Sequence, residues 1–149
     1  MDIKSPEERS KNMAAIRSKN TRPEMYFRKL LFAHGYRYSL NSGKVYGHPD
    51  IYLRKYNTAI FINGCFWHRH SGCKFAYMPK SRQDFWEKKF ETNRKRDCAV
   101  RLNLYNEKIK CLVIWECTVK NMKKDLKIEK EIIEKTEHFL ENNELFGEL

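Results

Sequence analysis

The segment from Cys65 to Cys73 is the feature that most restricts how this chain can fold. It places two cysteines and two histidines within nine residues, and Cys117 follows shortly after the apolar run Cys111–Trp115. Thiolate and imidazole groups are the ligands that bind zinc in tetrahedral structural sites. A continuous apolar run of this length is typical of a strand buried on both faces. A metal ion bound to both segments would therefore attach the loop to a central sheet.

The ligand set that we favour consists of three cysteines and one histidine: Cys65, His70, Cys73 and Cys117. An alternative set contains His68 in place of Cys117. Either set would form a closed site with four protein ligands, as in structural zinc sites. The simpler interpretation is that Cys65 or Cys117 is a small buried side chain without a metal. The two remaining cysteines, Cys98 and Cys111, are expected to pack in the interior.

Periodicity and capping motifs predict one α/β domain over residues 1–149, with a small mixed sheet flanked by helices. Cap residues and apolar spacing predict helices near residues 5–18, 22–34, 81–107 and 124–143. Short apolar runs predict strands at Tyr36–Leu40, Asp50–Leu53, Thr58–Ile62 and Cys111–Trp115. In the last helix, one face is expected to pack on the core through Ile128, Ile132, Ile133, Thr136 and Leu140.

Positive charge is concentrated in the first part of the chain. The formal net charge is +11, but residues 120–149 carry −2, so residues 1–119 carry +13. A positive electrostatic field from a net charge of this size favours a nucleic-acid partner, although basic proteins with other roles also have such a charge. The hydrophobic share of 41% excludes a disordered polycation. Because the chain has no apolar run of ~18 residues and no apolar secretion segment, we expect no membrane partner and a cytoplasmic location.

Asp50 is a candidate ligand for a divalent cation. It follows Pro49 at the start of an expected strand, and the next strand ends at Ile62, whose backbone would lie beside it. One carboxylate, one main-chain carbonyl, water and a phosphate oxygen can together hold Mg²⁺. An aspartate in a turn is the simpler interpretation of this motif alone. The nearby His68 and Glu24 favour the metal site, although Glu24 also fits the third position of a capping box.

Motifs spread over roughly residues 9–117 occur together in one known family. They are Ser10-Lys11-Asn12-Met13-x-x-Ile16, Gly47-x-Pro49-Asp50, Ile60-Phe61-x-x-Gly64-Cys65-Phe66-Trp67-His68, Phe85-Trp86-x-x-Lys89 with Asn93 and Arg96-Asp97, and Trp115-Glu116-Cys117. In these motifs the chain resembles the very-short-patch-repair (Vsr) DNA mismatch endonucleases. The resemblance implies a restriction-endonuclease-like fold, a structural zinc and catalytic Mg²⁺. It also implies nicking of one strand 5′ to the T of a T:G mismatch that arises from deamination of 5-methylcytosine.

The resemblance also implies roles for individual residues. Asp50 and the main-chain carbonyl of Ile62 would bind Mg²⁺, and Glu24 would support the hydration shell of that ion. His68 would act on the attacking water or the nearby phosphate. The zinc ligands of the family match the favoured set given above.

DNA contacts are expected from aromatic and basic residues. The aromatic residues that match the family's intercalating wedge are Phe66, Trp67 and Trp86. The basic N-terminal helix would enter the minor groove, with Met13 as a further wedge. Basic residues expected at phosphates are Arg9, Lys11, Arg17, Lys19 and Arg22, and a second patch contains Lys88, Lys89, Arg94, Lys95 and Arg96. The simpler interpretation of the second patch is a solvated helix face.

The chain departs from the well-studied members at a few positions. Asn63 stands where they carry histidine, and an amide can bind phosphate but cannot transfer a proton. Ile62 replaces threonine, which leaves a main-chain carbonyl ligand unaffected. The loop between His70 and Cys73 is one residue longer. Two other functions remain open at this point: a nuclease that cuts unmismatched duplex DNA, and a zinc module that binds DNA without cleaving it.

The resemblance further implies partners. We expect a monomer that binds double-stranded DNA containing a T:G mismatch and that associates with the nucleoid through this DNA. A functional link to a cytosine-5 DNA methyltransferase and to mismatch-repair proteins is also expected.

Overall fold

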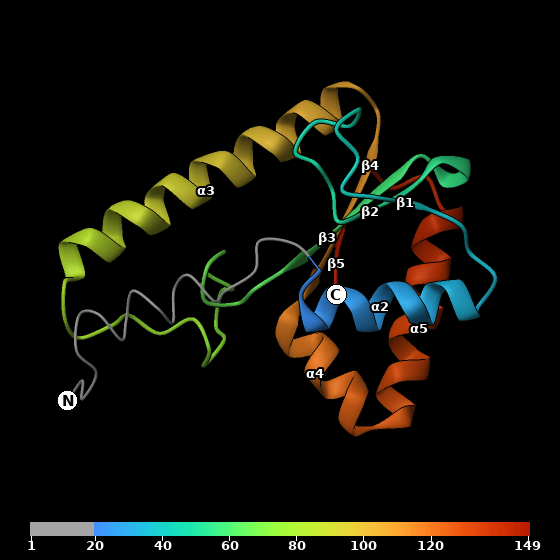
Figure 1. Cartoon of the computed structure of the whole chain (residues 1–149). Coiled ribbons are helices and arrows are strands. Elements are labelled where there is room, and N and C mark those ends of the chain that lie inside the picture. The colour runs from blue at the N-terminus through green and yellow to red at the C-terminus, as the bar shows by residue number, and fades with distance from the viewer. Residues whose placement is uncertain (1–19) are drawn as a thin grey trace.

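A five-stranded mixed sheet forms the centre of the structure, a computed structural model that describes residues 20–149 (Figure 1). The strands are β1 (Ser39–Leu40), β2 (Ile51–Leu53), β3 (Thr58–Asn63), β4 (Lys110–Trp115) and β5 (Phe146–Glu148), and they lie in this order across the sheet. The pairs β1–β2 and β2–β3 are antiparallel, whereas β3–β4 and β4–β5 are parallel. The expected small mixed sheet is therefore confirmed.

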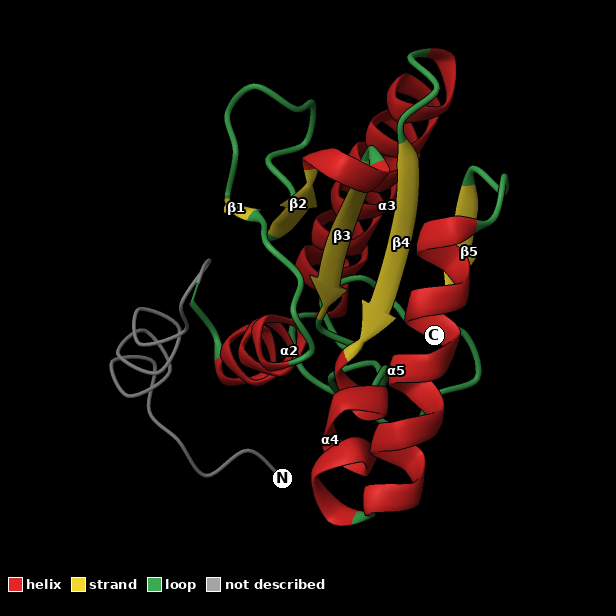
Figure 2. Cartoon of the chain, turned by 90° about the vertical axis from the view of Figure 1, so that its right-hand side faces the viewer, coloured by secondary structure: helices red, strands yellow, loops and turns green. Residues whose placement is uncertain are grey.

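Helices cover the two faces of the sheet unequally (Figure 2). Three helices lie on one face: α2 (Arg22–Ala33), α4 (Glu116–Lys124) and α5 (Leu126–Glu141). On the other face, the C-terminal part of α3 (Gln83–Asn106) packs through Leu104, while its first half extends beyond the sheet (Figure 1). Side chains alternate along β3, so Ile60 contributes to the first core and Ala59 to the second. The sheet thus separates two hydrophobic clusters.

Helix α2 begins where the capping motif predicts. The Thr21 hydroxyl accepts a hydrogen bond from the Glu24 N–H at 3.4 Å, and Pro23 occupies the first turn. Gly35 follows the helix with φ +92°, a backbone conformation that side chains with a Cβ rarely adopt. These local signals place Glu24 at the N-terminal end of a helix that is anchored in the core by Phe27.

Some expected elements differ from the observed ones. The strand expected at Tyr36–Leu40 is limited to Ser39–Leu40. The helix expected near 124–143 spans Leu126–Glu141, and a separate helix, α4, precedes it. The chain turns between the two helices at Asp125, whose side chain caps α5 by accepting from the Lys127 N–H at 2.9 Å. Neither α4 nor β5 was expected, because both are short and charged residues interrupt their apolar pattern.

Of the two cysteines assigned to the interior, one assignment is wrong. Cys111 lies in β4 and is buried, as expected. Cys98 is exposed, because the part of α3 that carries it is not covered on that side by another element. The expected helix at residues 5–18, with Arg9, Lys11, Met13 and Arg17, lies outside the described residues, as does Lys19. Within the described part of the chain, no helix is both long and apolar enough to cross a bilayer.

Lys110 joins β4 to the C-terminal end of α5. Its side chain is buried, and its ammonium donates to the carbonyl oxygens of Phe139 and Asn142, the latter at 2.6 Å. The last carbonyls of a helix have no partner within the helix, so a cation at this position satisfies them. Burial lowers the pKa of Lys110 from its usual value.

Replacing Lys110 with methionine tests this link. Lys110→Met keeps the aliphatic stem but leaves the two carbonyl oxygens without their donor, so we expect a loss of about 1–3 kcal/mol in the free energy of unfolding. Urea denaturation measures this change. The control is Lys108→Met at an exposed neighbouring position, with an expected change of about 0.5 kcal/mol or less. Equal effects of the two substitutions would show that the buried ammonium does not stabilise the end of α5.

Candidate functional site

Two carboxylic acids meet in a pocket beside the end of β3. Asp50 lies directly before β2, and Glu24 comes from the first turn of α2. The pocket has a volume of about 580 Å³. Other polar residues in its lining include Asn63, His68, Lys89, Asn93 and Arg96. The structure therefore brings four residues predicted to be catalytic into one pocket: Glu24, Asp50, Asn63 and His68.

The Asp50 carboxylate contacts a backbone donor and a second carboxyl group. Its Oδ2 accepts a hydrogen bond from the Ile62 N–H at 2.7 Å, and Glu24 lies within hydrogen-bonding reach of the same carboxylate. Burial and the charge of Glu24 raise the pKa of Asp50 to about 8, although the Ile62 N–H opposes this shift. Glu24 is itself buried, and its Oε2 accepts from the Asn20 N–H at 2.7 Å.

This arrangement fits a divalent cation. Two carboxylates in contact repel each other unless one is protonated or a cation lies between them. Carboxylate oxygens are the ligands that hard cations such as Mg²⁺ and Ca²⁺ prefer. The backbone contact that the structure gives Asp50 comes from the N–H of Ile62, so the role expected for the Ile62 carbonyl remains a prediction.

His68 is oriented by a carboxylate that the sequence did not single out. The His68 Nδ1 lies 2.7 Å from the Oδ2 of Asp97, which is on α3. This contact fixes the plane of the imidazole and leaves Nε2 as the nitrogen available to another group. Asp97 belongs to the Arg96-Asp97 motif, but no spacing rule relates it to a histidine 29 residues earlier. Proximity in the folded chain was required to identify this partner.

The amide and basic residues near the pocket differ in their environment. Asn93 on α3 donates through Nδ2 to the Trp67 carbonyl at 3.0 Å and so anchors the loop that follows β3. Lys89 and Arg96 line the pocket beside Asn93. In contrast, Arg94 is paired with Glu91 at 3.3 Å on an exposed part of the helix. Three other basic residues of the expected DNA surface are also exposed: Arg22, Lys88 and Lys95.

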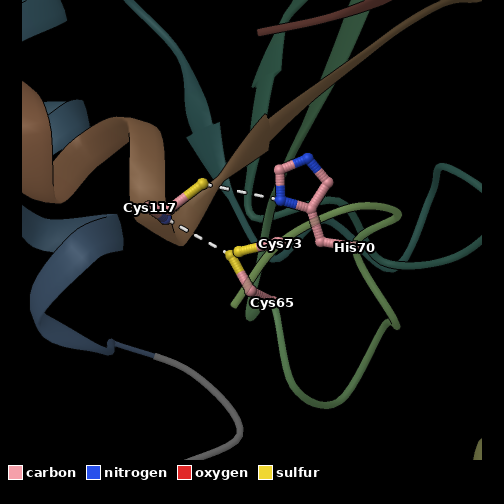
Figure 3. A group of neighbouring side chains, drawn as sticks. All are labelled: Cys65, His70, Cys73 and Cys117. Carbon is pink, nitrogen blue, oxygen red and sulfur yellow. Dashed lines mark hydrogen bonds between the residues drawn. The ribbon is translucent and has the colours of Figure 1, made fainter. Parts of the chain in front are cut away.

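The four favoured metal ligands lie together next to this pocket (Figure 3). The ligand atoms of Cys65, His70, Cys73 and Cys117 are all within 4.8 Å of one another. Three of these residues come from the loop after β3, and Cys117 comes from the first turn of α4. This group could therefore hold a metal ion that joins the loop to the sheet.

Contacts around the cluster keep its ligands in place. The Cys117 N–H donates to the Cys65 Sγ at 3.4 Å, and the His70 Nδ1 lies 3.5 Å from the Cys117 Sγ (Figure 3). The His70 ring also stacks on Trp115 with a centroid distance of 4.1 Å. His68 is not part of this group, so the alternative set that contained His68 does not match the geometry.

The expected aromatic wedge residues form one cluster. The Phe66 ring centroid lies 5.1 Å from that of Trp67 and 5.3 Å from that of Trp86. Phe90 on α3 lies beneath them, 5.2 Å from Phe66, and is almost fully buried. The other three rings are each partly exposed. The structure therefore places a partly exposed aromatic surface next to the carboxylate pocket, which Trp67 also lines.

Comparison with known proteins identifies the family. The family model described as DNA mismatch endonuclease Vsr matches residues 1–74. Type II nicking enzyme V.NmeAIP of Neisseria meningitidis serogroup A is 45% identical over 120 residues, which cover 80% of this chain and 85% of the relative. Type II nicking enzyme V.HpaIIP of Haemophilus parainfluenzae is 38% identical over 138 residues, or 91% and 98% of the two chains.

A relative named for mismatch cleavage also matches. DNA mismatch endonuclease Vsr of Escherichia coli K12 is 32% identical over 123 residues, which cover 83% of this chain and 78% of the relative. The resemblance found in the sequence motifs is thus confirmed, and the mixed sheet with its flanking helices is the restriction-endonuclease-like fold of this family. The chain belongs to the Vsr family and is a DNA endonuclease.

Proposed function

We propose that this endonuclease uses Mg²⁺ to nick one strand of duplex DNA 5′ to the T of a T:G mismatch, the product of 5-methylcytosine deamination. The observation that carries the proposal is the contact between the Asp50 and Glu24 carboxyls in a pocket that is also lined by His68, whose imidazole is hydrogen-bonded to Asp97. The Escherichia coli relative is named a DNA mismatch endonuclease, whereas the Neisseria relative is named a type II nicking enzyme. The partner that we propose is double-stranded DNA containing a T:G mismatch, with a functional link to a cytosine-5 DNA methyltransferase and to mismatch-repair proteins.

Asp50 and the main-chain carbonyl of Ile62 would hold the cation in this mechanism, and Glu24 would support its hydration shell. A bound Mg²⁺ would stabilise the negative charge that develops on the scissile phosphate. The N–H of Ile62 fixes one oxygen of Asp50, so the carboxylate keeps its orientation when the pocket fills. Glu24 is held in turn by the Asn20 N–H, which is consistent with support of the hydration shell.

His68 would move the proton in the hydrolysis. Its Nδ1 is engaged by Asp97, so its Nε2 would accept a proton from the attacking water or act on the phosphate. The contact with Asp97 keeps the imidazole in one orientation during this step. Asn63 cannot transfer a proton, but its amide can donate a hydrogen bond to a phosphate oxygen in the same pocket.

Mismatch selection would come from the aromatic cluster. Separating two stacked base pairs costs a few kcal/mol, and the cost is lowest at a mispair. Phe66, Trp67 and Trp86 would enter the duplex at that step, with Met13 as a wedge from the N-terminal segment. Positive side chains would bind the phosphates on either side, and the candidates are Lys11, Arg17, Lys89 and Arg96.

The Cys–His group would bind zinc and have a structural role. Thiolate and imidazole ligands prefer zinc over Mg²⁺, whereas the carboxylates of Asp50 and Glu24 have the opposite preference. The two metals would therefore bind at different sites according to ligand type. Zinc bound to Cys65, His70, Cys73 and Cys117 would hold the loop that carries the aromatic residues and His68.

Nicking of mismatched and matched duplexes tests the reaction and its substrate. With Mg²⁺, the wild-type protein is expected to nick a T:G duplex and to leave the matched T:A duplex intact. Asp50→Asn is expected to slow nicking on the order of 10³-fold, because it removes a charged metal ligand. The control Asp125→Asn keeps a good helix cap and should nick normally. Equal cutting of both duplexes would support the unmismatched nuclease instead, and unchanged nicking by Asp50→Asn would refute the metal site.

The raised pKa of Asp50 predicts how Mg²⁺ binding depends on pH. Because Asp50 holds a proton below about pH 8 in the metal-free protein, Mg²⁺ must displace this proton. Affinity should therefore rise by about tenfold per pH unit below pH 8 and level off above it. Isothermal titration calorimetry in buffers of different ionisation enthalpy measures the proton released. In Glu24→Gln, the pH range over which the affinity for Mg²⁺ rises should shift to lower pH. An affinity of the wild-type protein for Mg²⁺ that does not change between pH 6 and 8 would contradict the prediction.

Elemental analysis tests the zinc site. We expect about one equivalent of zinc in the purified protein. Cys117→Ser should lose the metal and become less soluble, because the loop is then detached from α4. Cys98→Ser changes an exposed thiol outside the group and should keep its zinc. A folded wild-type protein without bound metal would refute the assignment.

A further inference from the structure

Tyr77 is an exposed aromatic side chain that has no role in the function proposed above. Its side chain is 62% exposed, yet its ring lies against the aromatic cluster, 5.2 Å from Phe66 between centroids. It follows the Cys–His group in the loop that leads to α3. Tyr77 therefore extends the surface formed by Phe66, Trp67 and Trp86 further into solvent.

Arg69 holds the backbone of this loop at three points. Its Nη1 donates to the carbonyl oxygens of Tyr77 at 3.0 Å and Phe66 at 3.3 Å, and its Nη2 donates to that of Ala76 at 3.0 Å. The guanidinium carbon also lies 3.9 Å from the centre of the buried Phe90 ring. One side chain thus links both ends of the loop segment to helix α3.

The backbone of Arg69 adopts a conformation that costs free energy for a residue with a Cβ. Its φ is +54°, in the left-handed region that glycine adopts without strain and other residues rarely adopt. Such a conformation persists when surrounding contacts compensate for its cost. Here the contacts are the three hydrogen bonds and the stacking on Phe90, so the guanidinium is engaged within the protein.

The charge around Tyr77 favours a nucleic-acid ligand. Between residues 74 and 82 the chain contains three cations and no acidic residue: Lys74, Lys80 and Arg82. All three of these side chains are exposed. An exposed aromatic ring next to positive charges is the arrangement that binds unstacked bases, because the ring stacks on the base while the charges meet the phosphates.

We propose that Tyr77 stacks on a base of the bound DNA, and that Arg69 is a positioning residue that holds Tyr77 beside Phe66 for this contact. The inference rests on the proposed function, in which Phe66, Trp67 and Trp86 insert at the mismatch. By fixing the loop before DNA arrives, Arg69 reduces the ordering that binding would otherwise require. Arg69 acts on affinity through the position of Tyr77 and leaves the metal sites unaffected.

Tyrosine substitutions test the stacking contact. Binding of a fluorescent T:G duplex is measured by anisotropy without Mg²⁺, so that no cleavage occurs. Tyr77→Ala should bind on the order of tenfold more weakly, and Tyr77→Phe should bind like the wild type because it keeps the ring. The matched control is Tyr105→Ala, since Tyr105 is 60% exposed on the part of α3 that is distant in sequence from the cluster. If Tyr77→Ala binds as tightly as Tyr105→Ala, the stacking role is wrong.

Arg69→Gly tests the positioning role without straining the backbone. Glycine accepts the positive φ, so the fold and the zinc content should persist while the three hydrogen bonds are lost. Affinity should fall to the level of Tyr77→Ala, and the double variant should bind no more than slightly weaker than either single variant. Lys108→Gly is the control, because Lys108 is an exposed cation at φ +60°. Additive losses in the double variant, or lost zinc in Arg69→Gly, would overturn the positioning role.

The same measurements separate this inference from the proposed function. If the wild-type protein binds and nicks T:G and T:A duplexes equally, mismatch selection is wrong. A loss of affinity for both duplexes in Tyr77→Ala, but not in Tyr105→Ala, would still support stacking by Tyr77.

Discussion

The ligand atoms of one histidine and three cysteines meet at the end of the sheet, and the neighbouring loop is organised around them: Cys65, His70, Cys73 and Cys117. These ligand atoms lie within 4.8 Å of one another although they come from a loop and from the first turn of a helix beyond β4. The four residues between Cys65 and His70 comprise the two aromatic residues Phe66 and Trp67, His68 and Arg69. Fixing both ends of this short segment restricts where each of these side chains can reach.

The sheet explains why two sites of different chemistry are neighbours. Strands β3 and β4 are parallel, and Asn63 at the end of β3 pairs with Trp115 at the end of β4. Ligands bind at the carboxyl ends of the parallel strands in many α/β proteins. Here the chain leaves β3 into the Cys–His loop and leaves β4 into α4, which carries Cys117, while Asp50 meets the last residues of β3 through Ile62. The thiolate and imidazole ligands and the carboxylate ligands thus lie in separate sites at the same end of strands β3 and β4.

Local sequence predicted the elements whose signals lie within a few residues. Helix α2 begins after the Thr21 cap and ends before Gly35. The apolar run that ends at Trp115 forms the buried strand β4. The short elements α4 and β5 were missed, since they are stabilised by packing and by pairing with β4. Cys98 was assigned to the interior from residue type alone, but exposure depends on which part of α3 another element covers.

The order of residues in the chain sets which chemical groups are available: thiolates and imidazoles in one loop, a carboxylate at the start of a strand, and an excess of positive charge before residue 120. Which of these groups contact one another depends on the fold. The contacts of Asp50 with Glu24 and of His68 with Asp97 join residues whose relative positions local spacing does not set. The physical reason is that side-chain chemistry is fixed residue by residue, whereas these distances follow from strand register and from where each helix crosses the sheet.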